Sequence, residues 1–255
     1  MTTKIDLNRI WDDARAMAAA NAELLAVLAG MFVMLPMILS LQLIEGGAPA
    51  VAAPPPESFQ ALLDLYVAEM QAHWPVLLGR ELVAGFGMLA MLVLLLRENR
   101  PTVGESLRLA LMLLPGYLLA EMLEGMMLAL AFMAFVLPFI YLLARLVLVP
   151  AVAAAEGQAN PIALLRRSFV LTRGNGWRIV LMLAVLFLTT QLAVRVVVLM
   201  ISILGSLLLP DDLAVFAEHV AVGVMTGLVG ILSVLMTAAI YRATGMRRDA
   251  PLSAW

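Results

Sequence analysis

The 255-residue chain is 64% hydrophobic and 13% charged, and its formal net charge is −2. An ordinary soluble domain is roughly half apolar and about a quarter charged, so this composition excludes a typical soluble fold and predicts an integral membrane protein. The chain has no cysteine and only two histidines, so it offers few ligands for metals or redox groups. We therefore expect no cofactor, no metal site and no nucleic-acid partner.

Six stretches are long and apolar enough to cross a bilayer, which takes about 20 residues of helix for roughly 30 Å of hydrocarbon. They lie at residues 22–44, 75–96, 113–136, 138–155, 179–205 and 220–241. The fourth is the weakest, because it contains Arg145 and Pro150 and follows the third almost directly. The expected fold is an all-α, polytopic transmembrane bundle of about six spans in a single domain, residues 1–255.

Three short amphipathic helices are predicted before spans, where they would lie at the membrane interface. The first places an apolar stripe from Ile10 to Ala18 opposite charged residues, and the second begins with a capping box formed by Thr102 and Glu105. The third begins at Asn160, followed by a proline in the first helical position. One interpretation is three repeated units of an interfacial helix plus a hairpin, at residues 1–97, 98–156 and 157–255. The alternative is that such helices simply precede many spans.

The only sizeable external feature is expected between the first two spans, at residues 46–74. Residues 46–56 form a proline-rich spacer, and an amphipathic helix is predicted from about Ser58 to His73. Because its apolar residues fall on one side, this helix would lie on the outer leaflet or over the bundle.

The positions of the basic residues predict the orientation. With six spans, 13 of the 16 Lys and Arg residues fall on one side, in the loops and ends near residues 4–15, 97–108, 166–178 and 242–248. Short loops rich in Lys and Arg stay in the cytoplasm. We expect a multi-pass protein of a bacterial inner membrane with both termini in the cytoplasm.

One segment resembles a known family. The runs RLVLVP at 145–150, EG at 156–157, NPIA at 160–163 and RSFVLTRGNGW at 167–177 are similar to the signature of the YciC-like inner-membrane proteins. The same pattern occurs in the membrane domain of some glycerophosphoryl diester phosphodiesterases. The resemblance implies a polytopic fold of about six helices, but the chain has no soluble segment long enough for a phosphodiesterase domain.

Four ionisable residues fall within the predicted spans, where a charge costs about 2.5–3.5 kcal/mol at the bilayer centre and needs a partner or a purpose. They are Glu121, Glu124, Arg145 and Arg195. Glu121 and Glu124 share one helix face, and Arg145 is expected at a similar depth on the next span, so a Glu–Arg pair or triad is predicted. In one interpretation this cluster only joins two hairpins. In the other it forms a ligand-binding site for an anionic head group, with Arg195 and its neighbour Gln191.

A second basic cluster surrounds the third interfacial helix. Arg166, Arg167, Arg173 and Arg178 would contact anionic lipid phosphates, with Trp177 as an interface anchor. The simpler interpretation is that these arginines only set the topology.

The chain has no catalytic motif, since no serine lies in a nucleophile elbow and no Gly-rich phosphate loop precedes a helix. We expect a non-enzymatic inner-membrane protein that binds or transports a lipid or another amphiphile. The alternative is a structural or accessory protein that organises partners or membrane shape through its interfacial helices. Membrane lipids, and in the second case other membrane proteins, are the expected partners.

Overall fold

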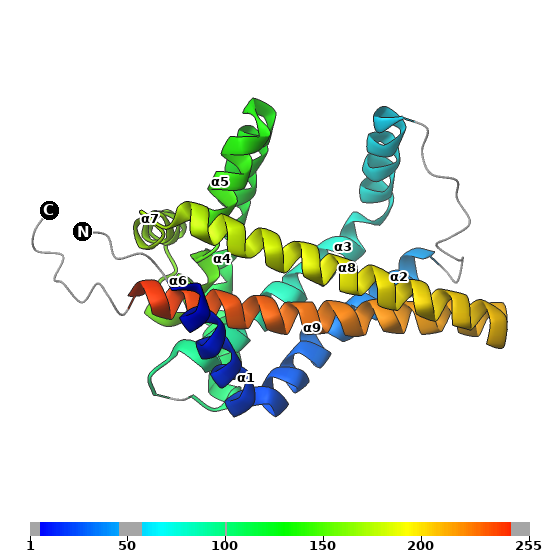
Figure 1. Cartoon of the computed structure of the whole chain (residues 1–255), viewed down its shortest axis with the longest axis horizontal. Helices are drawn as coiled ribbons and strands as arrows, with labels where there is room; N and C mark the ends of the chain where they lie inside the picture. Colours follow the sequence, from blue (N-terminus) through cyan, green and yellow to red (C-terminus); the bar gives the residue numbers. More distant parts are fainter. Residues whose placement is uncertain (1–5, 46–57, 100, 246–255) are drawn as a thin grey trace, which may run out of the picture.

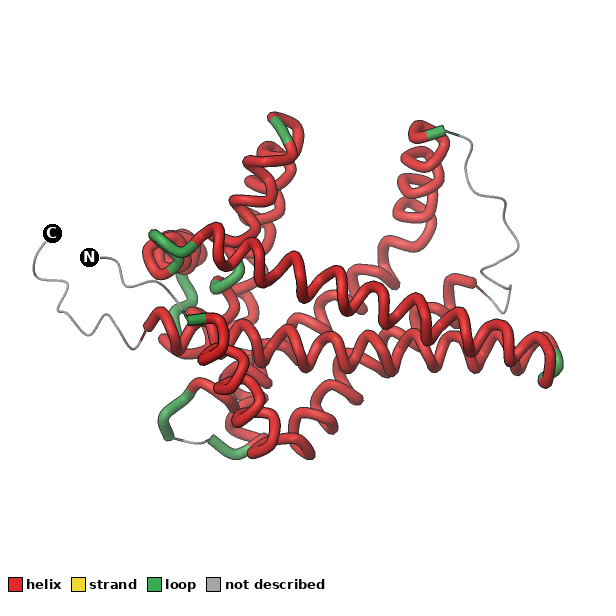
Figure 2. The backbone as a smooth tube through the Cα atoms, viewed as in Figure 1, coloured by secondary structure: helices red, strands yellow, loops and turns green. Residues whose placement is uncertain are grey.

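The computed structural model describes residues 6–45, 58–99 and 101–245, which fold into helices joined by short loops (Figure 2). In chain order the elements are α1 (Leu7–Ala29), the π-helix η1 (Gly30–Met34), α2 (Leu35–Glu45), α3 (Phe59–Leu96), α4 (Val103–Ala134), α5 (Val136–Leu146), α6 (Val149–Glu156), α7 (Pro161–Leu171), α8 (Gly176–Leu208) and α9 (Asp211–Gly245). Six candidate spans are long and apolar enough to cross a membrane. The predicted all-α, multi-pass fold is confirmed. The proline-rich spacer lies outside the described residues.

The first span follows a kink in α1 and is made of the second part of α1, η1 and α2. Asn21 has a non-helical backbone (φ −133°), and its side-chain amide donates to the Met17 carbonyl at 3.0 Å, so the predicted interfacial helix ends there in a kink. Ile10 on its predicted stripe is buried, whereas Trp11 is 43% exposed. The π-helical turn immediately precedes Pro36, which has no N–H to donate and crowds the preceding turn.

Two expected helix boundaries are wrong. The external helix predicted from Ser58 to His73 is continuous with the second span in α3, which passes through Pro75 without ending. The second interfacial helix likewise continues into the third span as α4, which starts with the predicted capping box of Thr102 and Glu105. A proline within a long span is tolerated because neighbouring groups in the bundle re-satisfy the freed carbonyl.

The fourth span is interrupted, as its weak pattern indicated. α5 ends at Leu146, and α6 begins at Val149 with Pro150 in its first turn. α6 ends at Gly157, whose φ is +65°. After it, Asn160 accepts hydrogen bonds from the backbone N–H groups of Ile162 (3.0 Å) and Ala163 (3.3 Å) and caps α7. Of the three predicted interfacial helices, this third one is a helix of its own, the first is set off from its span by the kink at Asn21, and the second is continuous with its span.

The helices gather at one end and spread apart at the other (Figure 1). α8 and α9 run side by side as an antiparallel pair, while α5 and the beginning of α3 project away from them. The fully buried residues include 89–93 of α3, most of α6 and 238–240 of α9. Arg97, Arg167 and Arg242 belong to the same part of the molecule, which we call the arginine-rich end. There, Arg242 near the end of α9 pairs with Asp13 of α1 at 3.1 Å.

The loop before α7 packs directly on α4 at Gly116. A Cβ atom at Gly116 would clash with the carbonyl oxygen of Ala159 and lie 2.7 Å from its carbonyl carbon. Gly125, on the same helix, has no neighbouring atom within 4 Å of such a position. These two glycines therefore provide a matched test of the packing.

Gly116→Ala is expected to destabilise the fold by about 1–3 kcal/mol, because overpacking against backbone cannot relax cheaply. Gly125→Ala should be neutral or gain up to roughly 1 kcal/mol, since alanine favours a helix over glycine. Thermal unfolding of the two purified variants measures the difference. Equal midpoints would contradict the described contact between α4 and the loop.

Candidate functional site

A cavity of about 570 Å³ lies between η1, α3, α4 and α9, and we call it the lateral cavity. Its walls are mostly apolar, but two carboxylates and a serine line it. The lining residues are Val33, Leu78, Glu81, Leu82, Ala84, Gly85, Met88, Met91, Leu118, Glu121, Met122, Gly230, Ser233 and Val234. This size and lining are typical of small-molecule sites, which combine apolar walls with a few polar groups.

Helical periodicity brings the two carboxylates to one place. On α3, Leu78, Glu81, Gly85 and Met88 recur every three or four residues and so share one face. α4 contributes Glu121 from the opposite wall. The two helices pack closely at Gly85, where a Cβ atom would make ordinary van der Waals contact with Tyr117 (3.7 Å) and a carboxylate oxygen of Glu121 (4.0 Å).

Glu121 is oriented by a tyrosine on its own helix. The hydroxyl of Tyr117, one turn earlier, donates to Glu121 Oε1 at 2.6 Å. Tyr117 is only 2% exposed, so its ring is fixed by packing and its hydroxyl cannot easily turn away. One oxygen of Glu121 is thereby satisfied, and the other has no described hydrogen bond and is left to accept one from a ligand or water.

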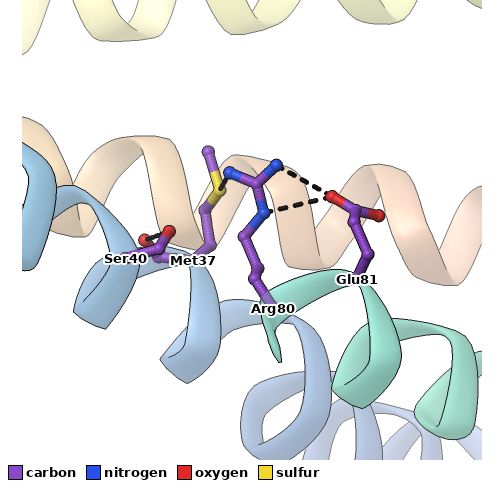
Figure 3. A network of polar contacts seen from close by, with 4 residues as sticks. All are labelled: Met37, Ser40, Arg80 and Glu81. Carbon is purple, nitrogen blue, oxygen red and sulfur yellow. Dashed lines mark hydrogen bonds and ion pairs between the residues drawn. The ribbon is translucent and has the colours of Figure 1, made fainter. Parts of the chain in front are cut away.

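Glu81 is held by its neighbour Arg80. Figure 3 shows the guanidinium lying between Glu81 and Met37 of α2: Nε and Nη2 donate to Glu81 Oε1 at 3.1 and 2.8 Å, and Nη1 contacts the Met37 sulfur at 3.6 Å. The Glu81 side chain remains 65% exposed. Ser40 bonds back to the Met37 carbonyl at 2.8 Å, which helps to fix that turn of α2.

Sequence reasoning missed Arg80 and Glu81 as site residues. The signal was present, because an adjacent Arg–Glu pair inside the predicted span at 75–96 is as costly as the four charges that were singled out. The sequence could not show which helices face Arg80 and Glu81 across the cavity, because the residues of those helices lie more than 30 positions away along the chain.

The expected pair between Arg145 and the two glutamates is not formed in the described part of the chain. Arg145 is 9% exposed and lies over the rings of Phe169 (5.2 Å) and Tyr141 (5.9 Å). Arg145 thus faces Phe169 of α7, whereas Glu121 faces α3 across the lateral cavity. Glu124 is half-buried, and no described residue bonds to it. Cation–π contact therefore replaces the predicted ion pair.

Arg195 and Gln191 lie on an exposed face of α8. Neither residue lines the lateral cavity, and no described interaction joins either of them to Glu121. α8 contributes few buried residues, and its apolar side chains mostly point outward. The structure thus does not bring the five predicted ligand-binding residues together. Of them, only Glu121 belongs to the lateral cavity.

The basic cluster around α7 is only partly exposed. Arg166 and Arg173 are exposed and Arg178 is half-buried. Trp177 is 63% exposed, with its ring 6.0 Å from that of Tyr141. Arg167 is also half-buried, and its Nε donates to Glu156 at 2.8 Å.

Comparisons with known proteins give no further guide: no family model, curated protein or solved structure matches the chain. Among the described residues, no group of three or more His, Asp or Glu side chains could hold a metal ion. The site is therefore interpreted from its own geometry.

The absence of cysteine allows a clean accessibility test of the lateral cavity. Ser233→Cys should react at least roughly tenfold faster with a charged, water-soluble thiol reagent than Ala193→Cys, because only a hydrated thiol ionises to the reactive thiolate. Ala193 is exposed on α8 and lines no part of the cavity. Equally slow labelling of both variants in membranes would contradict an open cavity.

Proposed function

We propose that the protein is a non-enzymatic, multi-pass membrane protein that binds an amphiphile in the lateral cavity and moves it within or across the bilayer. The observation that carries this proposal is the cavity itself, with mostly apolar walls and one carboxylate from each of the facing helices α3 and α4. The resemblance to YciC-like proteins agrees with a membrane role. We also propose that the arginine-rich end faces the cytoplasm of a bacterial inner membrane.

The charges of the cavity favour a particular class of head group. Arg80 partly neutralises Glu81, whereas Glu121 receives only a neutral hydroxyl. Carboxylates accept hydrogen bonds and attract positive charge. A ligand with an alkyl chain and a cationic or hydrogen-bond-donating head therefore suits this cavity better than the anionic head group expected at Arg145 and Arg195.

Binding of a fluorescent alkylammonium probe to the full chain in nanodiscs tests the proposal. Ser233→Trp should weaken binding at least roughly tenfold by filling the cavity, while Ala193→Trp on the exposed face of α8 should not. If both tryptophan variants bind like the wild type, the cavity is not the site.

Glu121→Gln tests the head-group assignment. The substitution should weaken binding of the alkylammonium probe roughly tenfold, because a hydrogen bond to a charged group is worth about 1.5–3 kcal/mol. The affinity for the matching alkyl alcohol should not change. Glu124→Gln is the matched control, since Glu124 lies one turn away and outside the cavity lining. Equal effects of the two variants would show that the cavity does not recognise the charge.

The second candidate is an accessory protein that holds another membrane protein. The observation that favours it is Arg195, which is exposed on α8 with no hydrogen bond or ion pair to a described residue. A charge at mid-bilayer is costly, and a partner helix could satisfy it. In that case Arg195→Leu would lower the recovery of a co-purifying membrane protein and leave probe affinity unchanged.

A further inference from the structure

A second cavity, of about 1030 Å³, opens at the arginine-rich end where α1, α3, α6, α7 and α9 meet. We call it the arginine cleft. Its charged lining includes Arg97, Arg167 and Arg242, and leucines of α1 and α3 form part of the wall. Three guanidinium groups thus share one space that is also partly apolar. This cleft was not foreseen from the sequence.

Two of these guanidinium groups are anchored on the last turn of α6. Arg97 donates its Nε to the Ala154 carbonyl at 2.8 Å, and Arg167 donates its Nε to Glu156 Oε1, also at 2.8 Å. The same Glu156 oxygen accepts a hydrogen bond from the Tyr241 hydroxyl at 3.1 Å. No described hydrogen bond uses an Nη atom of either arginine. Both side chains are therefore fixed through Nε, and their terminal N–H groups bond to no residue in the described part of the chain.

Gly157 makes room for one of these free ends. A Cβ atom at this position would lie 2.8 Å from Nη2 of Arg97, and the residue has φ +65°, which other residues rarely adopt. The backbone after α6 therefore approaches the guanidinium closely without blocking it.

The remaining charges of the cleft indicate what kind of ligand it fits. Arg242 is already paired through Nη1 with Asp13 at 3.1 Å, and Glu156 is engaged by Arg167. Glu98 is the one carboxylate of the cleft without a described ion pair or hydrogen bond. The groups without a partner among the described residues are thus the two Nη forks of Arg97 and Arg167, which match phosphate geometry, and one carboxylate, which suits an ammonium group.

We propose that the arginine cleft binds a phosphate ester that carries an ammonium group, as in the head group of an aminophospholipid. The phosphate lies between Arg97 and Arg167, and the ammonium group lies toward Glu98. The leucines of the wall favour a ligand with acyl chains over a free phosphate ester. This site is separate from the lateral cavity and does not depend on the proposal made for it.

The test is calorimetric titration of the full chain in phospholipid-free detergent with dihexanoyl phosphatidylethanolamine. Arg97→Lys and Arg167→Lys should each weaken binding roughly tenfold or more, because lysine keeps the charge but loses the paired N–H donors. Arg242→Lys is the matched control and should change affinity less than about twofold, since one of its two Nη atoms is already paired with Asp13, whereas the Nη atoms of Arg97 and Arg167 pair with no described residue. Equal affinities of all three variants would overturn the site.

Three further titrations separate the parts of the ligand. Dihexanoyl glycerol, which lacks the phosphate, should bind at least roughly tenfold more weakly than the phospholipid, and equal binding would overturn recognition of phosphate. Phosphoethanolamine, which lacks the chains, should also bind more weakly, and equal binding would overturn the lipid assignment. Glu98→Gln should weaken binding of the ethanolamine lipid and leave the affinity for dihexanoyl phosphatidylglycerol unchanged. Ser233→Trp should leave all of these affinities unchanged, which separates this site from the lateral cavity.

Discussion

Hydrocarbon offers no hydrogen bonds, so polar groups inside a membrane need partners within the protein. Most of this chain obeys that constraint locally. Thr190, Thr226 and Thr244 donate to carbonyl groups one turn earlier at 2.8–2.9 Å, and Arg80 is satisfied by its neighbour Glu81. The groups that remain incompletely satisfied stand out for this reason. Among the described residues they include the second carboxylate oxygens in the lateral cavity, the guanidinium Nη atoms of Arg97 and Arg167 in the arginine cleft, and Arg195 on α8.

The lateral cavity and the arginine cleft follow one another along the same two helices. α3 contributes Met91 to the cavity and Leu94 to the cleft, and α9 contributes Val234 and Tyr241 in the same order. The tightly packed part of α3 lies between the two spaces. The π-helical turn η1 borders the cavity and continues from the helix that lines the cleft. The fold therefore places a carboxylate-lined space and an arginine-lined space on one axis.

The sequence predicted the helices better than the site. Apolar length identified the six spans, and local cap chemistry identified the starts of α4 and α7. Prolines predicted helix ends less well, because Pro75 lies inside a continuous helix whereas Pro150 follows a break between two helices. Arg145 was misplaced because depth along a span can be counted from sequence, whereas the direction a side chain faces depends on which helices pack beside it. The arginine cleft was missed because five separate helices build it.

The central claim is that the lateral cavity holds an amphiphile. An electron cryomicroscopy map of the full chain in lipid nanodiscs tests it most directly. The account predicts elongated density between α3, α4 and α9, with its polar end near Glu81 and Glu121. A map in which side chains of these helices close the space, with no density beside the two carboxylates, would contradict it.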